Sequence, residues 1–374
     1  MKSILPFIYI ASFAILLIGI GHLAIYKSII TVFDVTSGRV LNFIRVFLIF
    51  GALSFVVVNF IIQTSYSKIG SFLYQMSAIW LGTVYFLFLA SIIILIIFTF
   101  AYLFGAPLIF ARVIGIILII GALSTSLYGV LHSYNILTTR YTVEINNLPD
   151  EWDGKNIVMF AESNFGNVRI VRFGKKLTEK INNENPEMVL IAGDYYDGPP
   201  ANDKEIAILM GNIKTENGIM FAPGNHEDYG NSASYKELLA SAGVEVLDNK
   251  MITIKGLQVA GINYFSGTHP DAFAKTIETF NLKDDMPKIL IKHAPTNLSV
   301  PAEANFDLVV SGHVHNGQIW PGPWITKKIY KEFSYGMNLL NKMTVITTSG
   351  VGTWGPLQRV GTNSEIVVIN LQKK

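Results

Sequence analysis

The chain has 374 residues and is 51% hydrophobic, with a mean hydropathy of +0.41, which is too apolar for a single water-soluble domain. Its 29 basic and 27 acidic side chains give a formal net charge of only +2 at neutral pH. The absence of cysteine excludes disulfides, thiolate chemistry and zinc–thiolate sites.

Charged side chains are distributed unevenly along the chain. Of the 29 basic and 27 acidic residues, six basic residues and one acidic residue lie within residues 1–135. The remaining residues therefore carry 23 basic and 26 acidic side chains, a net charge of −3. This division predicts a membrane domain over residues 1–135 and a water-soluble domain over residues 136–374. The slightly acidic second domain has no electrostatic footprint for nucleic acid, so we expect no nucleic-acid partner.

The first domain contains apolar runs that reach the roughly 20 residues needed to cross a bilayer. They lie at about 4–26, 41–63, 73–103 and 108–131. We therefore expect four transmembrane helices, a multi-pass location in the plasma membrane, and the lipid bilayer as a direct partner. Basic residues are more frequent beside the first and third loops, which favours cytoplasmic loops and an extracytoplasmic second domain. Charges are absent from the middle of the spans, which favours an anchor over a transporter or channel.

In the second domain, short apolar strands alternate with helices. Strands are predicted near residues 140–147, 156–161, 188–192, 219–222, 244–247, 251–255, 257–263, 288–292, 306–310, 343–348 and 365–371. Helices are predicted near residues 168–183, 203–213, 234–242 and 271–280. This alternation predicts an α/β layered domain, and in such domains ligands bind beyond the carboxyl ends of the strands.

Side chains that bind hard metal ions follow several of these predicted strands. They lie in the motifs Gly193-Asp-Tyr-Tyr-Asp197, Gly224-Asn-His-Glu227, Lys292-His293 and Ser311-Gly-His-Val-His-Asn-Gly-Gln318. Carboxylates, amide oxygens and neutral imidazoles are normal ligands of manganese, iron and zinc. Because each motif stands at the carboxyl end of a strand, the sequence predicts a hydrolytic site built around two metal ions.

Together with the closing segment Ser349-Gly-Val-Gly-Thr-Trp-Gly-Pro-Leu-Gln-Arg359, these motifs resemble those of the calcineurin-like metallophosphoesterases, in the branch with N-terminal membrane helices. The resemblance covers Tyr141 to the end of the chain and includes four motifs in the family's order. It implies a four-layer αββα domain with two mixed sheets. It also implies the activity of a metal-dependent phosphoric ester hydrolase.

The resemblance implies a role for each metal-binding residue. Asp194 matches the carboxylate that bridges two divalent ions, which would be manganese, iron or zinc. One ion would also be held by Asn225, His293 and His313, and His315 would serve the other ion.

The same resemblance implies an acid–base pair. His226 matches the general acid that protonates the leaving oxygen after attack by metal-activated water, and the Asp197 carboxylate would pair with its imidazole. In the protein-phosphatase branch an arginine follows this aspartate, whereas this chain has Gly198, which argues against phosphoproteins as substrates. Trp320 and Trp324 are expected to shape the rim of the site.

One motif departs from the family's pattern. The family has Asp-x-His after its first strand, where this chain has Glu162-Ser163-Asn164. Glu162 and Asn164 can still bind metal, but the loss of an imidazole weakens the second site or favours a harder ion.

Two hypotheses therefore stay open. The first is a hydrolase that cuts a phosphoester or phosphoanhydride bond in a phosphorylated small molecule or lipid associated with the membrane. The second is a catalytically silent relative, in which the altered metal site has become a binding or scaffolding surface.

Overall fold

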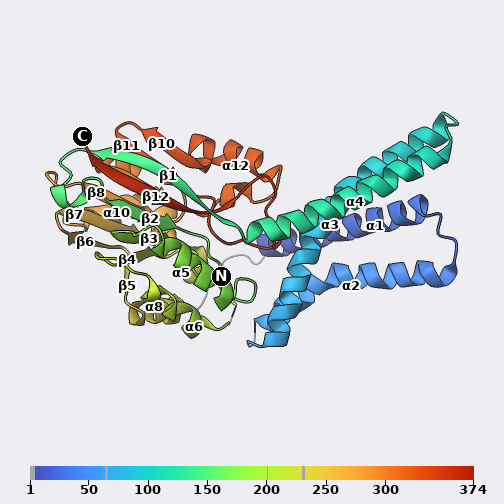
Figure 1. Ribbon diagram of the computed structural model, residues 1–374, viewed down its shortest axis with the longest axis horizontal. Coiled ribbons are helices and arrows are strands. Elements are labelled where there is room, and N and C mark those ends of the chain that lie inside the picture. Colours follow the sequence, from blue (N-terminus) through green and yellow to red (C-terminus); the bar gives the residue numbers. More distant parts are fainter. Residues whose placement is uncertain (1–4, 64–65, 200, 230–231) are drawn as a thin grey trace. The chain divides into compact units, whose positions relative to one another are not determined.

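The computed structural model describes residues 5–63, 66–199, 201–229 and 232–374 (Figure 1). The chain divides into two compact units. The helical unit takes in Met1–Gln63, Lys68–Val130 and Gly355–Gln358, as far as these residues are described. The α/β unit takes in the rest, namely Thr64–Ser67, Leu131–Trp354 and Arg359–Lys374, with the same restriction.

Long helices make up most of the helical unit. They are α1 (Leu5–Val32), α2 (Gly38–Ile62), α3 (Lys68–Leu103) and α4 (Leu108–Ser133). Of these, α2, α3 and α4 are long and apolar enough to cross a bilayer. In α1 the part with described side chains is the shorter apolar stretch Leu16–Val32. Three of the four expected spans are thus long and apolar enough to cross a bilayer. The first expected span extends beyond the part of α1 whose side chains are described.

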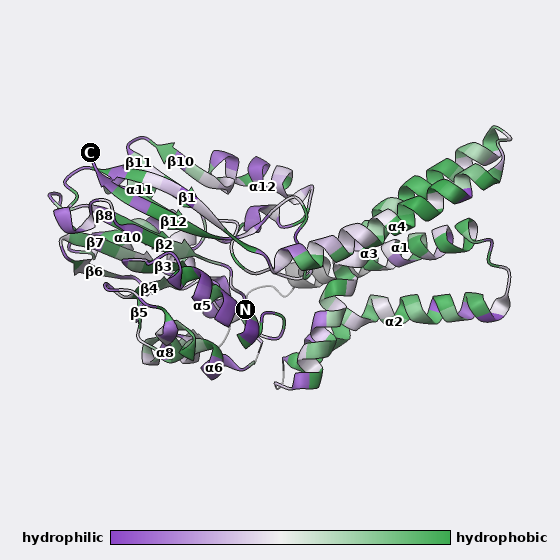
Figure 2. Ribbon diagram, viewed as in Figure 1, coloured by the Kyte–Doolittle hydropathy of each residue, from purple (hydrophilic) through white to green (hydrophobic). Residues whose placement is uncertain are grey.

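The surface of the helical unit is apolar, as expected for helices that face lipid. Large side chains such as Phe43, Phe50 and Phe60 are more than two thirds exposed, and Figure 2 shows hydrophobic residues along all the long helices. Polar groups inside the unit pair with one another, as between the Ser28 and Ser91 hydroxyls at 2.8 Å. The composition and length of these helices indicate association with a membrane.

Two six-stranded sheets form the centre of the α/β unit. The first has the order β1-β12-β2-β3-β4-β5 and the second the order β10-β11-β9-β8-β7-β6. The strands are β1 (Ile136–Ile145), β2 (Asn156–Phe160), β3 (Met188–Ala192), β4 (Ile219–Ala222), β5 (Val244–Val246), β6 (Lys250–Ile254), β7 (Leu257–Ile262), β8 (Lys288–Lys292), β9 (Leu308–Ser311), β10 (Gly336–Leu340), β11 (Met343–Thr347) and β12 (Ser364–Lys373). Antiparallel pairs occur at β12–β2, β6–β7 and β10–β11, and the other pairs are parallel. The expected α/β fold with two mixed sheets is confirmed.

Helices cover the outer faces of both sheets, and the sheets pack on each other. The α-helices of this unit are α5 (Val171–Asn182), α6 (Asp203–Ile208), α7 (Asn225–Tyr229), α8 (Ser232–Ser241), α9 (Tyr264–Thr268), α10 (Pro270–Glu278), α11 (Ser299–Glu303) and α12 (Gly322–Tyr330). Short 3-10 turns are η1 (Asp150–Trp152), η2 (Met210–Asn212), η3 (His315–Gly317) and η4 (Lys331–Ser334).

Three groups of buried side chains hold these layers together, because side chains alternate between the two faces of each strand. In β2, Val158 and Phe160 face α5, α6 and α8, whereas Ile157 and Met159 face the second sheet. On the far side, α10 and α11 cover β7, β8, β9 and β11. The central strands β3 and β8 are buried along their whole length, which explains the apolar sequence of β3 and the apolar residues Ile289–Ile291 at the centre of β8.

The segment after the last metal-binding motif differs most from the prediction. The sequence indicated only a loop there, whereas the chain forms α12 and the edge strand β10. The large apolar side chains of α12 are exposed, so the helix has no apolar face packed on the core. A surface helix is usually predicted from the sequence pattern of such a face. The predicted helix at 203–213 also ends early, since α6 stops at Ile208 and η2 follows.

Candidate metal centre

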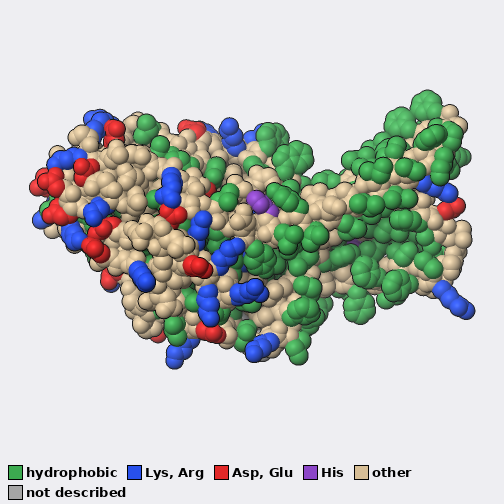
Figure 3. Space-filling model, viewed as in Figure 1, with side chains coloured by type: hydrophobic (Ala, Val, Ile, Leu, Met, Phe, Trp, Pro, Cys, Tyr) green, Lys and Arg blue, Asp and Glu red, His purple; other side chains and the backbone are tan. Residues whose placement is uncertain are grey.

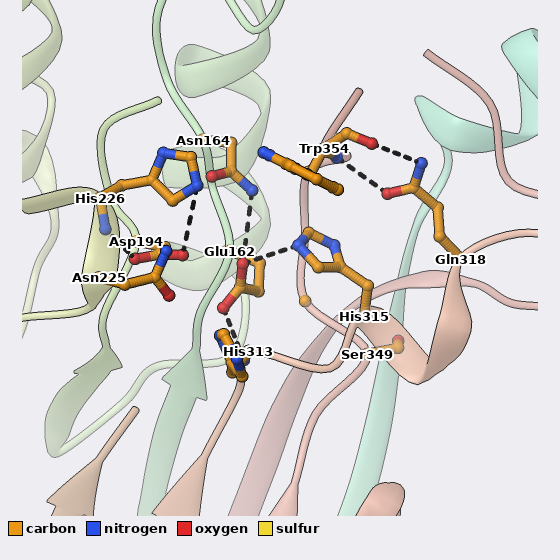
Figure 4. Close-up of polar contacts among 12 residues, drawn as sticks. Glu162, Asn164, Asp194, Asn225, His226, His313, His315, Gln318, Ser349 and Trp354 are labelled. Carbon is orange, nitrogen blue, oxygen red and sulfur yellow. Dashed lines mark hydrogen bonds and ion pairs between the residues drawn. The ribbon is translucent and has the colours of Figure 1, made fainter. Parts of the chain in front are cut away.

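The candidate metal centre lies where strands of both sheets end (Figure 4). Glu162 and Asn164 follow β2, Asp194 follows β3, Asn225 and His226 follow β4, His293 follows β8, and His313 and His315 follow β9. The carboxyl ends of these parallel strands meet at one edge, so residues far apart in the sequence come together. The structure thus brings together every side chain that the sequence predicted to bind metal.

Several of these residues have a backbone conformation that residues other than glycine rarely adopt. The φ angles of Glu162, Asp194 and His313 are 56°, 50° and 70°, in the left-handed region. Such conformations cost about 1–3 kcal/mol each and persist where the surrounding structure fixes them, most often at functional sites. Here they turn the side chains sharply from the strand ends into a common space.

Two glycines allow the loops to approach one another closely. A Cβ atom at Gly193 would lie 2.4 Å from His293 Nδ1, and one at Gly224 would lie 2.1 Å from Asp194 Oδ1. These separations are too short for any side chain, so the Gly-Asp and Gly-Asn sequences are required by packing as well as by turn geometry.

One group of candidate ligands surrounds the Nε2 atom of His293. This atom lies 3.2 Å from Asp194 Oδ2, 3.1 Å from Asn225 Oδ1 and 3.1 Å from His313 Nδ1. The other ring nitrogen, Nδ1, lies 2.8 Å from the Ala192 carbonyl and donates to it. That hydrogen bond leaves Nε2 free to bind a metal ion, the usual arrangement for metal-binding histidines. The ligand atoms of Asp194, His293 and His313 all lie within 4.8 Å of one another.

A second group of candidate ligands lies around Glu162. Its Oε2 atom is 2.7 Å from His315 Nε2 and 3.5 Å from Asn164 Nδ2, and its Oε1 atom accepts from the His313 backbone N–H at 2.6 Å. Among the residues that the structure describes, buried Asn164 Oδ1 and His315 Nδ1 have no hydrogen-bond partner. Buried polar atoms without partners are rare and call for an explanation. A metal ion held by these side chains provides one, so the donor set fits a second ion.

The electrostatics of the centre favour cations. Burial lowers the pKa of His293, but the charges of Asp194 and Glu162 outweigh burial and raise it to about 10. Burial raises the pKa of the Glu162 carboxyl, but the charges of His315 and His293 outweigh burial and hold it below its usual range. Both shifts show that anionic oxygen and positive charge stabilise each other here, as they would with a bound divalent ion.

The contact between His226 and Asp197 differs from the expected one. The sequence predicted a carboxylate–imidazole pair, but His226 Nδ1 lies 2.7 Å from the backbone carbonyl of Asp197 and donates to that oxygen. The predicted acceptor, the Asp197 carboxylate, was therefore wrong. The acceptor is the Asp197 backbone carbonyl, because the turn after Asp194 brings this part of the main chain close to the ring. The second ring nitrogen, Nε2, lies 3.9 Å from Asp194 Oδ2 and faces the candidate metal ligands.

Glu227 is a residue whose role the sequence reasoning missed. It is fully buried and accepts hydrogen bonds from the backbone N–H groups of Asp194, Tyr196 and Gly224, each at 2.9 Å. It therefore ties the loop after β3 to the loop after β4. Its place directly after His226 was the available signal, but the motif alone assigned no role to this carboxylate.

Replacing Glu227 with glutamine should destabilise the α/β unit. The amide retains one acceptor oxygen but turns an NH2 group toward a backbone donor, and an unsatisfied buried group costs about 1–3 kcal/mol. We expect a lower melting temperature in detergent, measured by thermal unfolding, and weaker metal retention. Glu237→Gln, at an exposed position of α8, is the matched control. Equal melting temperatures for the two variants would contradict the bracing role of Glu227.

Arg359 supports the loop on the opposite side of the centre. It is fully buried, and its guanidinium donates to the carbonyls of His315, Ser349 and Gly352 at 3.3, 2.6 and 2.8 Å. The closing motif of the sequence contains this residue, but its function as a brace for the His315 loop becomes visible only in three dimensions.

Gln318 holds the loop that carries Trp354. The side-chain amide of Gln318 accepts from the Trp354 backbone N–H at 2.8 Å and donates to its carbonyl at 3.0 Å. This pair of bonds fixes the main chain, while the Trp354 side chain remains exposed beside the candidate metal ligands (Figure 4).

Part of the chain is similar to known proteins. Residues 168–317 match the calcineurin-like phosphoesterase family. An uncharacterized metallophosphoesterase of Campylobacter jejuni is 32% identical over 62% of this chain, and one of Helicobacter pylori is 30% identical over 58%. A transmembrane protein with metallophosphoesterase domain from Danio rerio is 26% identical over 62% of the chain and 56% of its own length. The chain covers 62% and 60% of the two bacterial relatives.

Proposed function

We propose that this protein is a membrane-anchored, metal-dependent hydrolase of phosphoester or phosphoanhydride bonds, because residues 168–317 match the calcineurin-like phosphoesterase family. The proposed substrates are phosphorylated small molecules or lipids associated with the membrane. The observation that carries the proposal is the convergence of two groups of metal-binding side chains beside an imidazole whose Nε2 faces them. A silent binding protein would have no use for that imidazole.

We assign the candidate ligands to two divalent ions, manganese, iron or zinc. The Asp194 carboxylate would serve both ions. One ion would also be held by Asn225, His293 and His313, and the other by Glu162, Asn164 and His315. Two such ions, when bound, lower the pKa of a shared water and neutralise the phosphoryl oxygens. The structure supports a second site through the unpartnered Asn164 Oδ1 and His315 Nδ1 atoms, counted among the described residues.

His226 is proposed as the general acid. Its Nδ1–H group donates to the Asp197 carbonyl, which fixes the ring and leaves Nε2 to carry the proton transferred to the leaving oxygen. Burial lowers the pKa of His226, but the charges of Asp194 and Asp197 outweigh burial and raise the pKa. A raised pKa extends to higher pH the range over which Nε2 carries a proton, which favours this role.

The membrane arrangement is part of the same proposal. We propose that residues 1–135 form a domain of four transmembrane helices, that residues 136–374 form the catalytic domain, and that the protein is a multi-pass plasma-membrane protein with its catalytic domain outside the cytoplasm. The helices α2, α3 and α4 and the apolar Leu16–Val32 segment support the first part. The excess of basic residues beside the first and third loops supports the orientation.

Metal content and hydrolysis, measured together on detergent-purified full-length protein, test the proposal. We expect about two ions per chain by elemental mass spectrometry, hydrolysis of p-nitrophenyl phosphate or bis(p-nitrophenyl) phosphate, and loss of hydrolysis on chelation with recovery on adding manganese. A chain without bound metal and without turnover, even in excess manganese, would favour the silent relative. A single ion that Asn164→Ala does not displace would exclude Asn164 from the ligands.

The pH dependence of the Asp197→Asn variant tests the unexpected contact. The backbone carbonyl still accepts from His226 Nδ1, so the ring stays in place, but the charge that raises the pKa of His226 is lost. Activity that needs protonated His226 falls as pH rises through the pKa of His226, which gives the pH profile an alkaline limb. A lower pKa of His226 in the variant moves this limb to lower pH. Burial raises the pKa of Asp197 itself to about 7, so the loss should be largest above neutral pH. An unchanged limb in the kcat/KM profile would contradict this account.

A further inference from the structure

The helix α12 presents an exposed surface of tryptophan, isoleucine and lysine. Trp320, just before the helix, is 63% exposed, and within it Trp324, Ile325 and Ile329 are 60%, 48% and 66% exposed. Lys327 and Lys328 are exposed as well. We call this set the α12 surface: Trp320, Trp324, Ile325, Lys327, Lys328 and Ile329. Figure 3 shows hydrophobic and basic side chains next to one another over this part of the α/β unit.

Helical spacing places the members of this set on one side of α12. Trp324, Lys327 and Lys328 are related by three and four residues, and so are Ile325 and Ile329, so they form two adjacent stripes. Thr326 and Tyr330 fall on the opposite side and are half-buried. The apolar side chains therefore face outward, which is the reverse of an ordinary surface helix.

We propose that the α12 surface docks onto the headgroup region of a bilayer that contains anionic lipid. Tryptophan is enriched at membrane interfaces, and lysine places its charge among headgroups while its alkyl chain covers apolar surface. Lys328 Nζ lies 3.6 Å from the centre of the Trp324 ring, so the ring and the charged group would lie at the same depth in the headgroup region. The segment from Asn316 to Lys331 contains three lysines and no acidic residue, a charge complementary to anionic lipid.

The covalent structure puts a bilayer within reach of this surface. Helix α4 is long and apolar enough to cross a membrane, and β1 begins at Ile136, after a connection of two residues from Ser133. Two extended residues span only about 7 Å. A bilayer is thus always near this unit, whereas a protein partner would have to be recruited.

Docking would fix the His315 side of the metal centre at the lipid surface. The backbone of Gly317 touches that of Gly322, since a Cβ atom on either would lie within 2.0 Å of the other residue. The Gly322 N–H donates to the Ile319 carbonyl at 2.7 Å, and the Trp320 N–H donates to the Val360 carbonyl at 2.9 Å. These contacts make α12 and the His315 loop move together, so a docked α12 presents this rim of the site to lipid-borne phosphate groups.

The absence of cysteine allows a direct measurement of depth. A nitroxide on Ile329→Cys in the full-length protein, reconstituted into phosphatidylcholine bilayers with and without phosphatidylglycerol, reports its accessibility to oxygen and to a water-soluble nickel complex. We expect an oxygen-to-nickel accessibility ratio several times that of a control label at exposed Lys275→Cys on α10 in the anionic bilayer, and a smaller ratio without phosphatidylglycerol. Lys327→Glu combined with Lys328→Glu should lower the ratio to that of the control.

Two results would overturn the inference. A ratio equal to that of the Lys275→Cys label in anionic bilayers would mean that the surface stays in water. An immobile label with low accessibility to both reagents would mean that protein, either a second copy or another partner, covers it instead. The lipid comparison uses one labelled protein throughout, so an unstable lysine variant cannot imitate either result.

Discussion

Replacing His226 with alanine should lower the turnover of a phosphate ester by about 10²–10⁴-fold, the usual contribution of a positioned general acid. The number of bound metal ions should not change, because the backbone N–H of residue 226 still donates to Asp194 Oδ1, at 2.9 Å in the structure. Single-turnover hydrolysis and elemental analysis of the same sample check both statements.

The structure also suggests a way to separate acid catalysis from folding. A substrate with a good leaving group, such as p-nitrophenolate, needs little protonation, so His226→Ala should impair its hydrolysis less than that of an alkyl phosphate. The exposed His269→Ala variant serves as the control. Equal losses for the two leaving groups, or full activity in His226→Ala, would exclude this residue as the acid.

Replacing Asp194 with asparagine should remove metal and activity together. The amide oxygen can still accept from the His226 backbone N–H, but the site loses the negative charge that its Oδ2 atom presents 3.2 Å from His293 Nε2. Metal content should fall below one ion per chain, and kcat/KM should fall by about 10³-fold or more. Bound metal ions stabilise the transition state by several kcal/mol, and each step of about 1.4 kcal/mol corresponds to a tenfold change in rate.

Asp271→Asn, at an exposed position near the start of α10, controls for the loss of a charge alone. Together, His226→Ala and Asp194→Asn separate the acid from the metal ligands of the proposed site. His226→Ala is expected to keep its metal and lose turnover, whereas Asp194→Asn is expected to lose both. If Asp194→Asn kept about two ions, the assignment of this carboxylate as the bridge would be wrong.

The sequence by itself determined which residues compose the candidate site. The strands β3, β4, β8 and β9 are short and mainly apolar, and each is closely followed by a candidate metal-binding residue. Their identity and the position of the candidate site could therefore be predicted locally. The apolar composition of the first 135 residues likewise predicted the membrane helices, because length and hydropathy are properties of the sequence alone.

Only the tertiary structure decided which atoms meet. The Asp197 carbonyl accepts from His226, and Glu227 accepts from three backbone N–H groups. Both contacts depend on the turns after β3 and β4, and the turn after β3 contains the left-handed Asp194. The same is true of Asn164: its Nδ2 donates to Glu162 Oε2 at 3.5 Å, and its buried Oδ1 has no hydrogen-bond partner within the part of the chain that is described. Helix α12 escaped prediction because its apolar side chains face outward, and periodicity predicts a helix only when a buried face imposes it. Sequence patterns indicate which face each strand or helix buries. Contacts between loops depend instead on which strands, distant in the sequence, end at the same edge of the sheets.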